Sequence, residues 1–154
     1  MGEISIREVL DRNIILTNLE AESKRDVIDS LTESLLKCKY IQSKDDFIRS
    51  VNEREAQGAT GIGNSIAIPH GRSATVQRNG VAIAILRHEI SWESLDSTGA
   101  KVVVLFAVGA SGENSQEHLK LLSLFARQLA KESVTDRLLK ATDVDQVIDA
   151  FLNE

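Results

Sequence analysis

The sequence predicts an α/β fold: a single domain in which a mixed β-sheet of about five strands is sandwiched between helical layers. Two long runs of β-branched and apolar residues, 81–86 and 101–108, are typical of strands that are covered on both faces. Apolar residues recur at three- and four-residue spacing before and after these runs, which is typical of amphipathic helices. Because the helices cluster around the main strands instead of alternating strictly with them, a mixed sheet is favoured over a purely doubly wound one.

The N-terminal part of the chain is predicted to be mostly helical. A short helix near residues 5–11 and a brief strand at 14–16 precede an amphipathic helix over 23–39. Ser43 and Asp46 have the spacing of a capping box and open the next helix. The inward-facing apolar residues of the two longer helices are Val27, Ile28, Leu31, Leu35, Phe47, Ile48 and Val51.

The remainder of the chain supplies most of the sheet. A short strand at 66–68 precedes the two long ones, and residues 90–92 form a short edge strand. Residues 109–114 form a loop, after which Ser115 caps a long helix. The apolar stripe of that helix comprises Leu119, Leu122, Ala126 and Leu129. The last three helices are expected at about 115–131, 134–141 and 144–153.

Length and composition indicate one globular domain, residues 1–154. The chain is 42% hydrophobic and 27% charged, as is usual for a soluble protein. Its 18 basic and 23 acidic residues give a net charge of −5, and the basic residues form no block. Nucleic acid and anionic membranes need a concentrated positive face, so we expect neither as a partner. The acidic balance suits a basic protein partner, and the oligomeric state stays open.

Targeting signals and cysteine chemistry are not indicated. No apolar run approaches the roughly 20 residues that span a bilayer, and no basic segment followed by a hydrophobic one opens the chain. We therefore expect a cytoplasmic protein without membrane insertion. Cys38 is the single cysteine, which excludes an internal disulfide and a cysteine zinc cluster. We expect it on or near the buried face of a helix.

The segment 58–72 is the most informative one for function. A glycine-rich approach and a short apolar strand lead to His70, which lies between Pro69 and Gly71. Pro69 fixes its own φ and cannot donate to a sheet, and Gly71 has no Cβ. Both neighbours suit a strand end that another molecule's backbone approaches closely. From residue types alone, a histidine in an ordinary turn explains the pattern equally well.

Arg54 and His118 accompany His70. Arg54 lies in Val-Asn-Glu-Arg-Glu, in the last turns of a helix that ends near Gly58, and His118 starts the run His-Leu-Lys-Leu-Leu-Ser-Leu-Phe-Ala. The stretch from Asn-Glu-Arg-Glu through Gly-Ile-Gly-Asn-Ser-Ile-Ala-Ile-Pro-His-Gly, with Ile-Ser-Trp at 90–92 and His-Leu at 118, resembles the fructose- and mannitol-type (type 2) enzyme IIA domains. These belong to the bacterial phosphoenolpyruvate-dependent sugar phosphotransferase system, including its nitrogen-related branch. The resemblance spans nearly the whole chain and implies the same α/β architecture.

The resemblance also implies a function for each of these residues. His70 is expected to accept a phosphoryl group, through Nε2, from the phosphocarrier HPr and to pass it to an enzyme IIB domain on a separate chain. Arg54 and His118 are expected to flank the phosphoryl group, and no cofactor or metal is needed. The alternative is a regulatory phosphoprotein of the nitrogen-related branch, whose phosphorylation state controls protein binding.

Other chemistries are less well supported. The glycines at 58–63 lack both the Gly-Lys-Ser/Thr end of a P-loop and a third Rossmann glycine before a helix. A zinc site at His70 and His118 would need a third ligand that no nearby motif supplies. Without the resemblance, Arg54 is better explained as a solvated arginine paired with an acid. His88 is expected on the surface and Trp92 in the core.

The surroundings of the site leave one question open. Ile62 and Ile66 are expected to form a shallow apolar rim where protein partners dock. The loop 109–117 lacks a proline and departs from the usual form of the family, so its part in partner contact is not defined.

Overall fold

The computed structural model describes residues 5–152, with the side chains of 113–115 left aside, and contains a six-stranded mixed sheet. The strand order is β1-β5-β6-β3-β2, and β4 also pairs with β6. The strands are β1 (Ile15–Leu19), β2 (Gly61–Gly63), β3 (Ile66–Ala67), β4 (His70–Arg72), β5 (Gly80–Ile90) and β6 (Ala100–Val108). The helices are α1 (Ile6–Val9), the 3-10 turn η1 (Arg12–Ile14), α2 (Lys24–Lys37), α3 (Lys44–Glu55), α4 (Gly112–Leu129), α5 (Glu132–Lys140) and α6 (Val144–Leu152).

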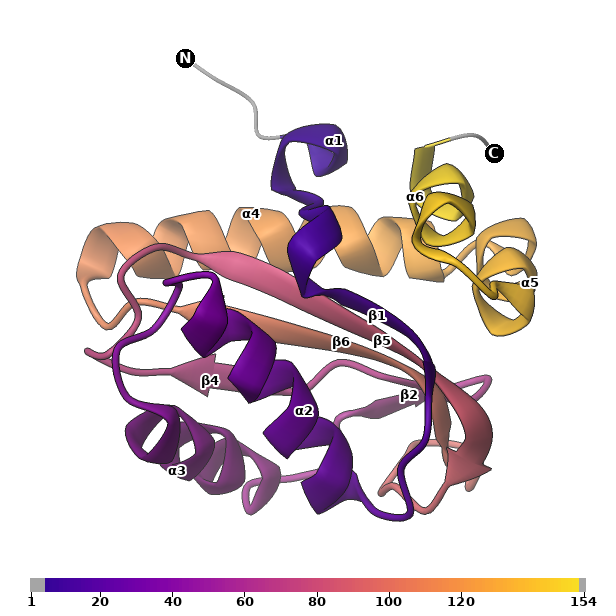
Figure 1. Ribbon diagram of the computed structural model, residues 1–154, viewed down its shortest axis with the longest axis horizontal. Coiled ribbons are helices and arrows are strands. Elements are labelled where there is room, and N and C mark those ends of the chain that lie inside the picture. Colours follow the sequence, from indigo (N-terminus) through magenta and orange to yellow (C-terminus); the bar gives the residue numbers. More distant parts are fainter. Residues whose placement is uncertain (1–4, 153–154) are drawn as a thin grey trace.

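The sheet is mixed, as predicted. β5 and β6 form its long antiparallel centre, β1 runs parallel to β5, and β3 and β4 run parallel to β6. The short β2 pairs antiparallel with β3. Helices α2 and α3 cover one face, whereas α1, α4, α5 and α6 cover the other (Figure 1). The predicted fold class is therefore confirmed.

Two hydrophobic cores follow from the alternation of side chains along the central strands. In β5, Ala82 and Ala84 face α2 and α3, whereas Val81 and Ile83 face the α4 side. The continuous apolar run that predicted this strand thus serves both cores at once. Leu31, Leu35 and Phe47 fill the first core, and Phe106, Phe125 and Phe151 fill the second.

Several predicted boundaries need correction. Ile14 belongs to η1 and the first strand starts at Ile15. The expected edge strand at 90–92 is absent among the described residues, because Ile90 ends β5 and Ser91 and Trp92 lie outside any strand. Strands β2 and β4 were not predicted, since three residues are too few to show a periodic pattern.

The start and the buried face of α4 also differ from the prediction. The helix begins at Gly112, before the predicted cap Ser115, whose side chain lies outside the described part of the chain. Leu119 is 65% exposed and Ala126 is exposed, whereas Leu121 and Phe125 are buried. Apolar residues lie on more than one side of this helix, so periodicity alone did not identify the side that packs on the sheet.

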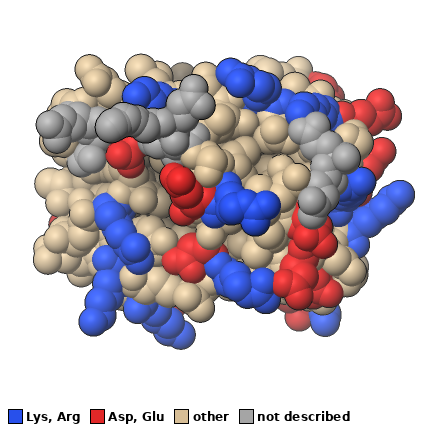
Figure 2. All heavy atoms as spheres, turned by 90° about the horizontal axis from the view of Figure 1, so that it is seen from above, with Lys and Arg blue, Asp and Glu red and all other residues tan. Residues whose placement is uncertain are grey.

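Cys38 and the surface agree with expectation. Cys38 follows the last turn of α2 and is half-buried against the first core. On the face that carries α1, α4 and α6, basic and acidic side chains are interspersed (Figure 2). Within residues 5–152, none of the helices is both long enough and apolar enough to cross a membrane.

Candidate functional site

His70 opens strand β4 at the edge of the central strand β6. It lies opposite Phe106 in a parallel pairing, and the Phe106 N–H donates to the carbonyl of Pro69 at 3.0 Å. Pro69 thus contributes to the sheet through its acceptor alone, as its missing N–H requires. The sequence predicted that His70 ends the preceding short strand. In the structure it begins β4 instead.

Gly71 is required by packing within the chain, and not by the approach of another molecule as predicted. A Cβ at this position would lie 2.5 Å from Cε1 of Phe47 and 2.9 Å from Cγ2 of Val51. Both residues belong to α3, so the close approach is made by this chain's own helix and not by another molecule. The missing side chain allows α3 to pack directly on β4.

His118 faces His70 from α4. The two ring centroids lie 5.1 Å apart, with the ring planes at 85°. The Phe106 ring lies 5.3 Å from that of His70 and 5.8 Å from that of His118. Because α4 begins at Gly112, His118 lies in the second turn of the helix and not in the first, as had been predicted.

Arg54 reaches the same place from the last turn of α3. Its Nη1 donates to the carbonyl of Gly58 at 3.2 Å. Arg54, His70 and His118 line one open pocket of about 530 Å³. Its other lining residues are Ser50, Glu53, Gln57, Arg72 and Val108. The structure therefore brings together all three residues that the sequence singled out.

The environment keeps the imidazole of His70 neutral. Burial, followed by the nearby His118 and Arg54, lowers the pKa of His70 to about 4, against a smaller opposing effect of the Ile68 backbone. Its Nδ1 is buried and has no hydrogen-bond partner among the described residues. Burial, and then the charge of Arg72, also lowers the pKa of His118. Both rings are thus uncharged near neutral pH.

The charges around the pocket favour an anion. Arg54 and Arg72 bring two guanidinium groups, and each uses one nitrogen on a backbone carbonyl: Arg54 on Gly58, and Arg72 on Ala110 at 3.0 Å. The other N–H groups of each fork are donors that suit a multiply charged oxyanion. Within the described part of the chain, no three His, Cys, Asp or Glu side chains gather as a metal site would require.

Comparison with known proteins identifies the family. Residues 8–154 match the family described as "Phosphoenolpyruvate-dependent sugar phosphotransferase system, EIIA 2". The chain belongs to this EIIA 2 family. The resemblance in the sequence is thereby confirmed.

Relatives of the EIIA 2 family include sugar-specific and regulatory proteins. The chain is 32% identical over 146 residues to the "PTS system fructose-specific EIIABC component" of Bacillus subtilis. The match covers 95% of this chain but only 23% of that protein. The nitrogen regulatory protein IIA-Ntr of Neisseria meningitidis has a solved structure that superposes with a TM-score of 0.85. It is 25% identical and covers 95% of this chain and 98% of its own.

A third comparison supports the fold. Enzyme IIA of the mannitol system of Escherichia coli, solved in a complex with phosphorylated enzyme IIB, superposes with a TM-score of 0.79 at 24% identity. The match covers 94% of this chain and 98% of that one. Both structural neighbours therefore share the EIIA 2 architecture over nearly the whole chain.

Some residues of this EIIA 2 site were missed in the sequence. Arg72 lies two residues after His70 in the same strand, so the two side chains project on one side of β4. Ser50 lies four residues before Arg54 on the same face of α3, Glu53 is the neighbour of Arg54 in the helix, and Gln57 follows the end of the helix. These spacings were visible, but they gain meaning only once the strand and the helix are placed around a pocket.

Other residues lie outside the site. His88 is on an exposed part of β5, and Trp92 is 6% exposed, both as predicted. Ile66 is 1% exposed within the second core, so the prediction that it forms an exposed rim is wrong. Ile62 packs against the same core and is half-buried. The apolar side chain that lines the pocket is Val108.

Proposed function

We propose that this chain is a histidine phosphocarrier that takes a phosphoryl group from HPr onto His70 and passes it to an enzyme IIB domain on another chain. One observation carries the proposal: a neutral, half-buried imidazole lies in a pocket with two guanidinium groups and a second imidazole. A neutral imidazole is a competent nucleophile, and the cationic groups suit the charge of the phosphoryl oxygens.

In the accepting step, a lone pair on Nε2 of His70 attacks the phosphorus held on a donor histidine. The new P–N bond forms as the donor's P–N bond breaks, and the donor nitrogen keeps that electron pair. Nδ1 of His70 carries the remaining proton throughout. We assign the attack to Nε2 because Nδ1 is buried. The second step reverses these events with the IIB nucleophile.

The surrounding side chains stabilise the transferring charge. The planar fork of Arg54 is able to hold two phosphoryl oxygens at once, and His118 donates to a third through its own Nε2. Arg72 adds a second guanidinium on the His118 side. Because a carrier must release what it accepts, this stabilisation has to be moderate, which fits a pocket that is open to partners.

A regulatory function is the second candidate. The similarity to IIA-Ntr, at a TM-score of 0.85 over 95% of the chain, supports it. In that case His70 is phosphorylated in the same way, and the phosphorylation state controls binding to other proteins. Mixing the phosphorylated chain with candidate IIB domains separates the two functions, because only a sugar-system carrier loses its phosphate to one of them.

Phosphorylation with purified components tests the proposal. Incubation with phosphoenolpyruvate, enzyme I and HPr should add one acid-labile, base-stable phosphate, and His70→Ala should abolish it. His88→Ala is the control, since His88 is exposed and does not line the pocket. A label that survives in His70→Ala and maps to His118 or His88 would overturn the assignment.

A further inference from the structure

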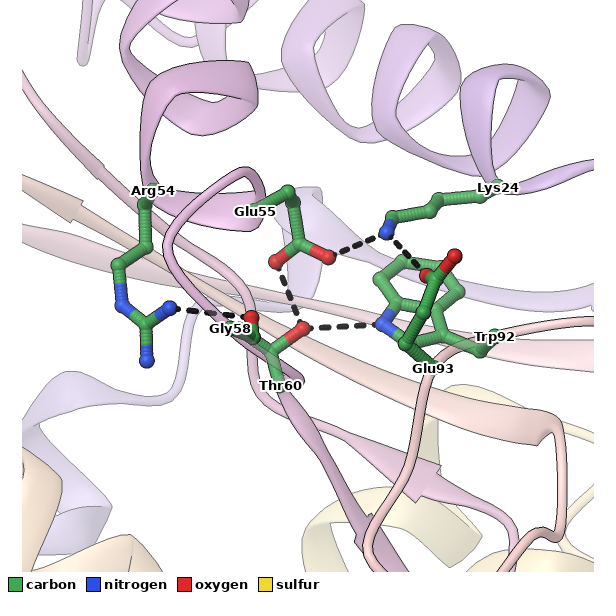
Figure 3. Close-up of polar contacts among 7 residues, drawn as sticks. All are labelled: Lys24, Arg54, Glu55, Gly58, Thr60, Trp92 and Glu93. Carbon is green, nitrogen blue, oxygen red and sulfur yellow. Dashed lines mark hydrogen bonds and ion pairs between the residues drawn. The ribbon is translucent and has the colours of Figure 1, made fainter.

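A second polar cluster lies next to Arg54, at the end of α3. Glu55 is the next residue along α3, and its side chain is only 7% exposed. Both of its oxygens have partners: Oε1 lies 2.5 Å from Nζ of Lys24, and Oε2 accepts a hydrogen bond from Oγ1 of Thr60 at 2.6 Å. Figure 3 shows Arg54 and Glu55 extending to opposite sides of the helix end.

The cluster continues to Trp92. The indole Nε1 donates to Oγ1 of Thr60 at 2.9 Å, and the Thr60 hydroxyl in turn donates to Glu55. Nζ of Lys24 lies 5.1 Å from the centre of the indole ring, within range of a cation–π interaction. Lys24 also pairs at 2.7 Å with Glu93, whose side chain is 72% exposed. We call Lys24, Glu55, Thr60 and Trp92 the anchor cluster.

The anchor cluster is connected to Arg54 through a short loop. The guanidinium donates to the carbonyl of Gly58, which lies between Glu55 and Thr60 (Figure 3). Because Glu55 and Thr60 are bonded to each other, they close this loop at both ends. The position of the Gly58 carbonyl, and with it the direction of the Arg54 side chain, therefore depends on that hydrogen bond.

A buried charged cluster of this kind is a poor source of stability. Taking a carboxylate and an ammonium out of water costs about as much as their attraction returns, and well-packed apolar residues often serve equally well. Thr60 is 2% exposed and Trp92 is 6% exposed, so their polar atoms need partners wherever they are retained. Hydrogen bonds with a fixed direction, made next to Arg54, suggest that the cluster positions the Arg54 side chain.

We infer that the anchor cluster is a positioning device that fixes the guanidinium of Arg54 in the pocket of His70. Its effect on phosphoryl transfer rests on the proposed function. Its effect on the geometry of Arg54 does not, and is measurable in the unphosphorylated protein.

The first test compares two carboxylates that share one lysine. Glu55→Gln and Glu93→Gln each remove one acid from Lys24, but only Glu55 is bonded to the loop that holds Arg54. We expect Glu55→Gln to lower the transfer rate at saturating donor about tenfold, the effect of losing part of a charged hydrogen bond. Glu93→Gln should stay close to wild type. Equal rates in the two variants would contradict the inference.

A double-mutant cycle separates positioning from general damage to the fold. If Glu55 acts through Arg54, then Glu55→Gln should slow transfer little further in an Arg54→Ala background. A purely structural effect would instead multiply with the loss of Arg54. Urea denaturation of wild type, the two single variants and the double variant measures the loss of stability that Glu55→Gln causes with and without Arg54. Positioning predicts that this loss is the same in both backgrounds, whereas the effect on the rate is not.

The pKa of His70, followed by NMR of its imidazole, is the readout that needs no phosphoryl transfer. Removing the negative charge of Glu55 would by itself lower this pKa. Moving the positive Arg54 away from the ring would raise it. A rise in Glu55→Gln, in the same direction as in Arg54→Ala and absent in Glu93→Gln, supports positioning. An unchanged or lower pKa overturns it, even if the protein carries no phosphate at all.

Thr60 provides an independent pair of variants in case Glu55→Gln does not fold. Thr60→Val keeps the shape of the side chain but removes the hydroxyl that joins Trp92 to Glu55, whereas Thr60→Ser retains that hydroxyl. We expect Thr60→Val to reproduce the slower transfer and the raised pKa of His70, and Thr60→Ser to restore most of both. If valine and serine behave alike, the hydrogen bonds of the anchor cluster do not position Arg54.

Discussion

Arg54 lies between two polar clusters that differ in how their buried polar atoms are paired: Oε1 of Glu55, which has no hydrogen bond within residues 5–152, is paired with the charge of Lys24. In the anchor cluster, Glu55, Thr60 and Trp92 bond to one another, and the cationic Lys24 balances the buried carboxylate. In the pocket, Nδ1 of His70 and Nδ1 of His118 are buried without hydrogen-bond partners among the described residues. The same helix end therefore carries one cluster whose buried atoms are paired by hydrogen bonds or by an ion pair, and one whose buried imidazole nitrogens have neither within the described part of the chain.

The difference indicates what each cluster is for. Buried polar groups are normally paired, and exceptions in a folded protein require an explanation. The pocket combines two neutral imidazoles with free N–H donors of Arg54 and Arg72, and a phosphoryl group on Nε2 of His70 would accept from those donors. The anchor cluster has no free donors for a ligand, so we expect it to act through the geometry of the neighbouring Arg54.

Arg54→Lys should have the largest effect on the pocket short of removing His70. Lysine keeps the positive charge but lacks the planar fork, so it cannot bond two phosphoryl oxygens and the Gly58 carbonyl together. We expect phosphoryl transfer to slow about 10- to 100-fold, equivalent to one or two charged hydrogen bonds. The measurement is single-turnover transfer from phosphorylated HPr. Wild-type rates would remove Arg54 from the site.

Arg72→Ala should have a smaller effect on the same rate. Arg72 acts from the His118 side and is more exposed than Arg54, so solvent screens its charge more strongly. We expect transfer to slow by up to about tenfold. Arg127→Ala is the matched control, because Arg127 is an exposed arginine in the last turn of α4, outside the lining of the pocket. Equal effects in both variants would mean that only net charge matters.

The sequence predicted those parts of the molecule whose pattern is local. The helix over 23–39 and the helix opened by Ser43 were predicted because their apolar spacing and the cap are local, and the structure confirms them as Lys24–Lys37 and Lys44–Glu55. The Ser43 side chain accepts from the N–H of Asp46, as the capping spacing indicated. His70, Arg54 and His118 were found together because the motif around His70 is specific.

The features that the sequence missed depend on contacts between distant segments. Arg72 could be assigned to the pocket only from the structure, in which β4 pairs with β6. The anchor cluster joins Lys24, the segment 55–60 and Trp92, three separate parts of the chain, and no spacing in the sequence shows that they meet. The buried side of α4 was predicted only in part for the same reason: Leu122 and Leu129 pack on the second core as predicted, whereas Leu119 and Ala126 do not.

Gly71→Ala should disturb the support beneath the pocket. The added methyl group would lie 2.5 Å from Cε1 of the fully buried Phe47, so the Phe47 ring or the whole of α3 must shift. Overpacking of this kind costs about 1–3 kcal/mol in the free energy of unfolding. Gly112→Ala is the control, since a Cβ there meets nothing within 4 Å. Urea denaturation should show a loss in the first variant only, and equal midpoints would contradict the packing argument.

The pH dependence of stability reports on the protonation of the pocket histidines. The pKa of His70 is about 4 in the folded protein, below the 6.5 of an unperturbed histidine. Between these two values the unfolded chain binds a proton that the folded chain does not, so the unfolded state becomes more favourable as the pH falls. The free energy of unfolding of wild type should therefore decrease from about pH 6.5 towards about pH 4.

His70→Asn removes this titration and should flatten part of the decrease, while His118, whose pKa is also lowered, retains the rest. Urea denaturation of both proteins at pH 7 and pH 5 measures the difference. Parallel losses in the two proteins would show that His70 titrates normally in the folded state. The imidazole of His70 would then be mostly protonated below about pH 6, and it would have to lose that proton before it could accept a phosphoryl group at such a pH.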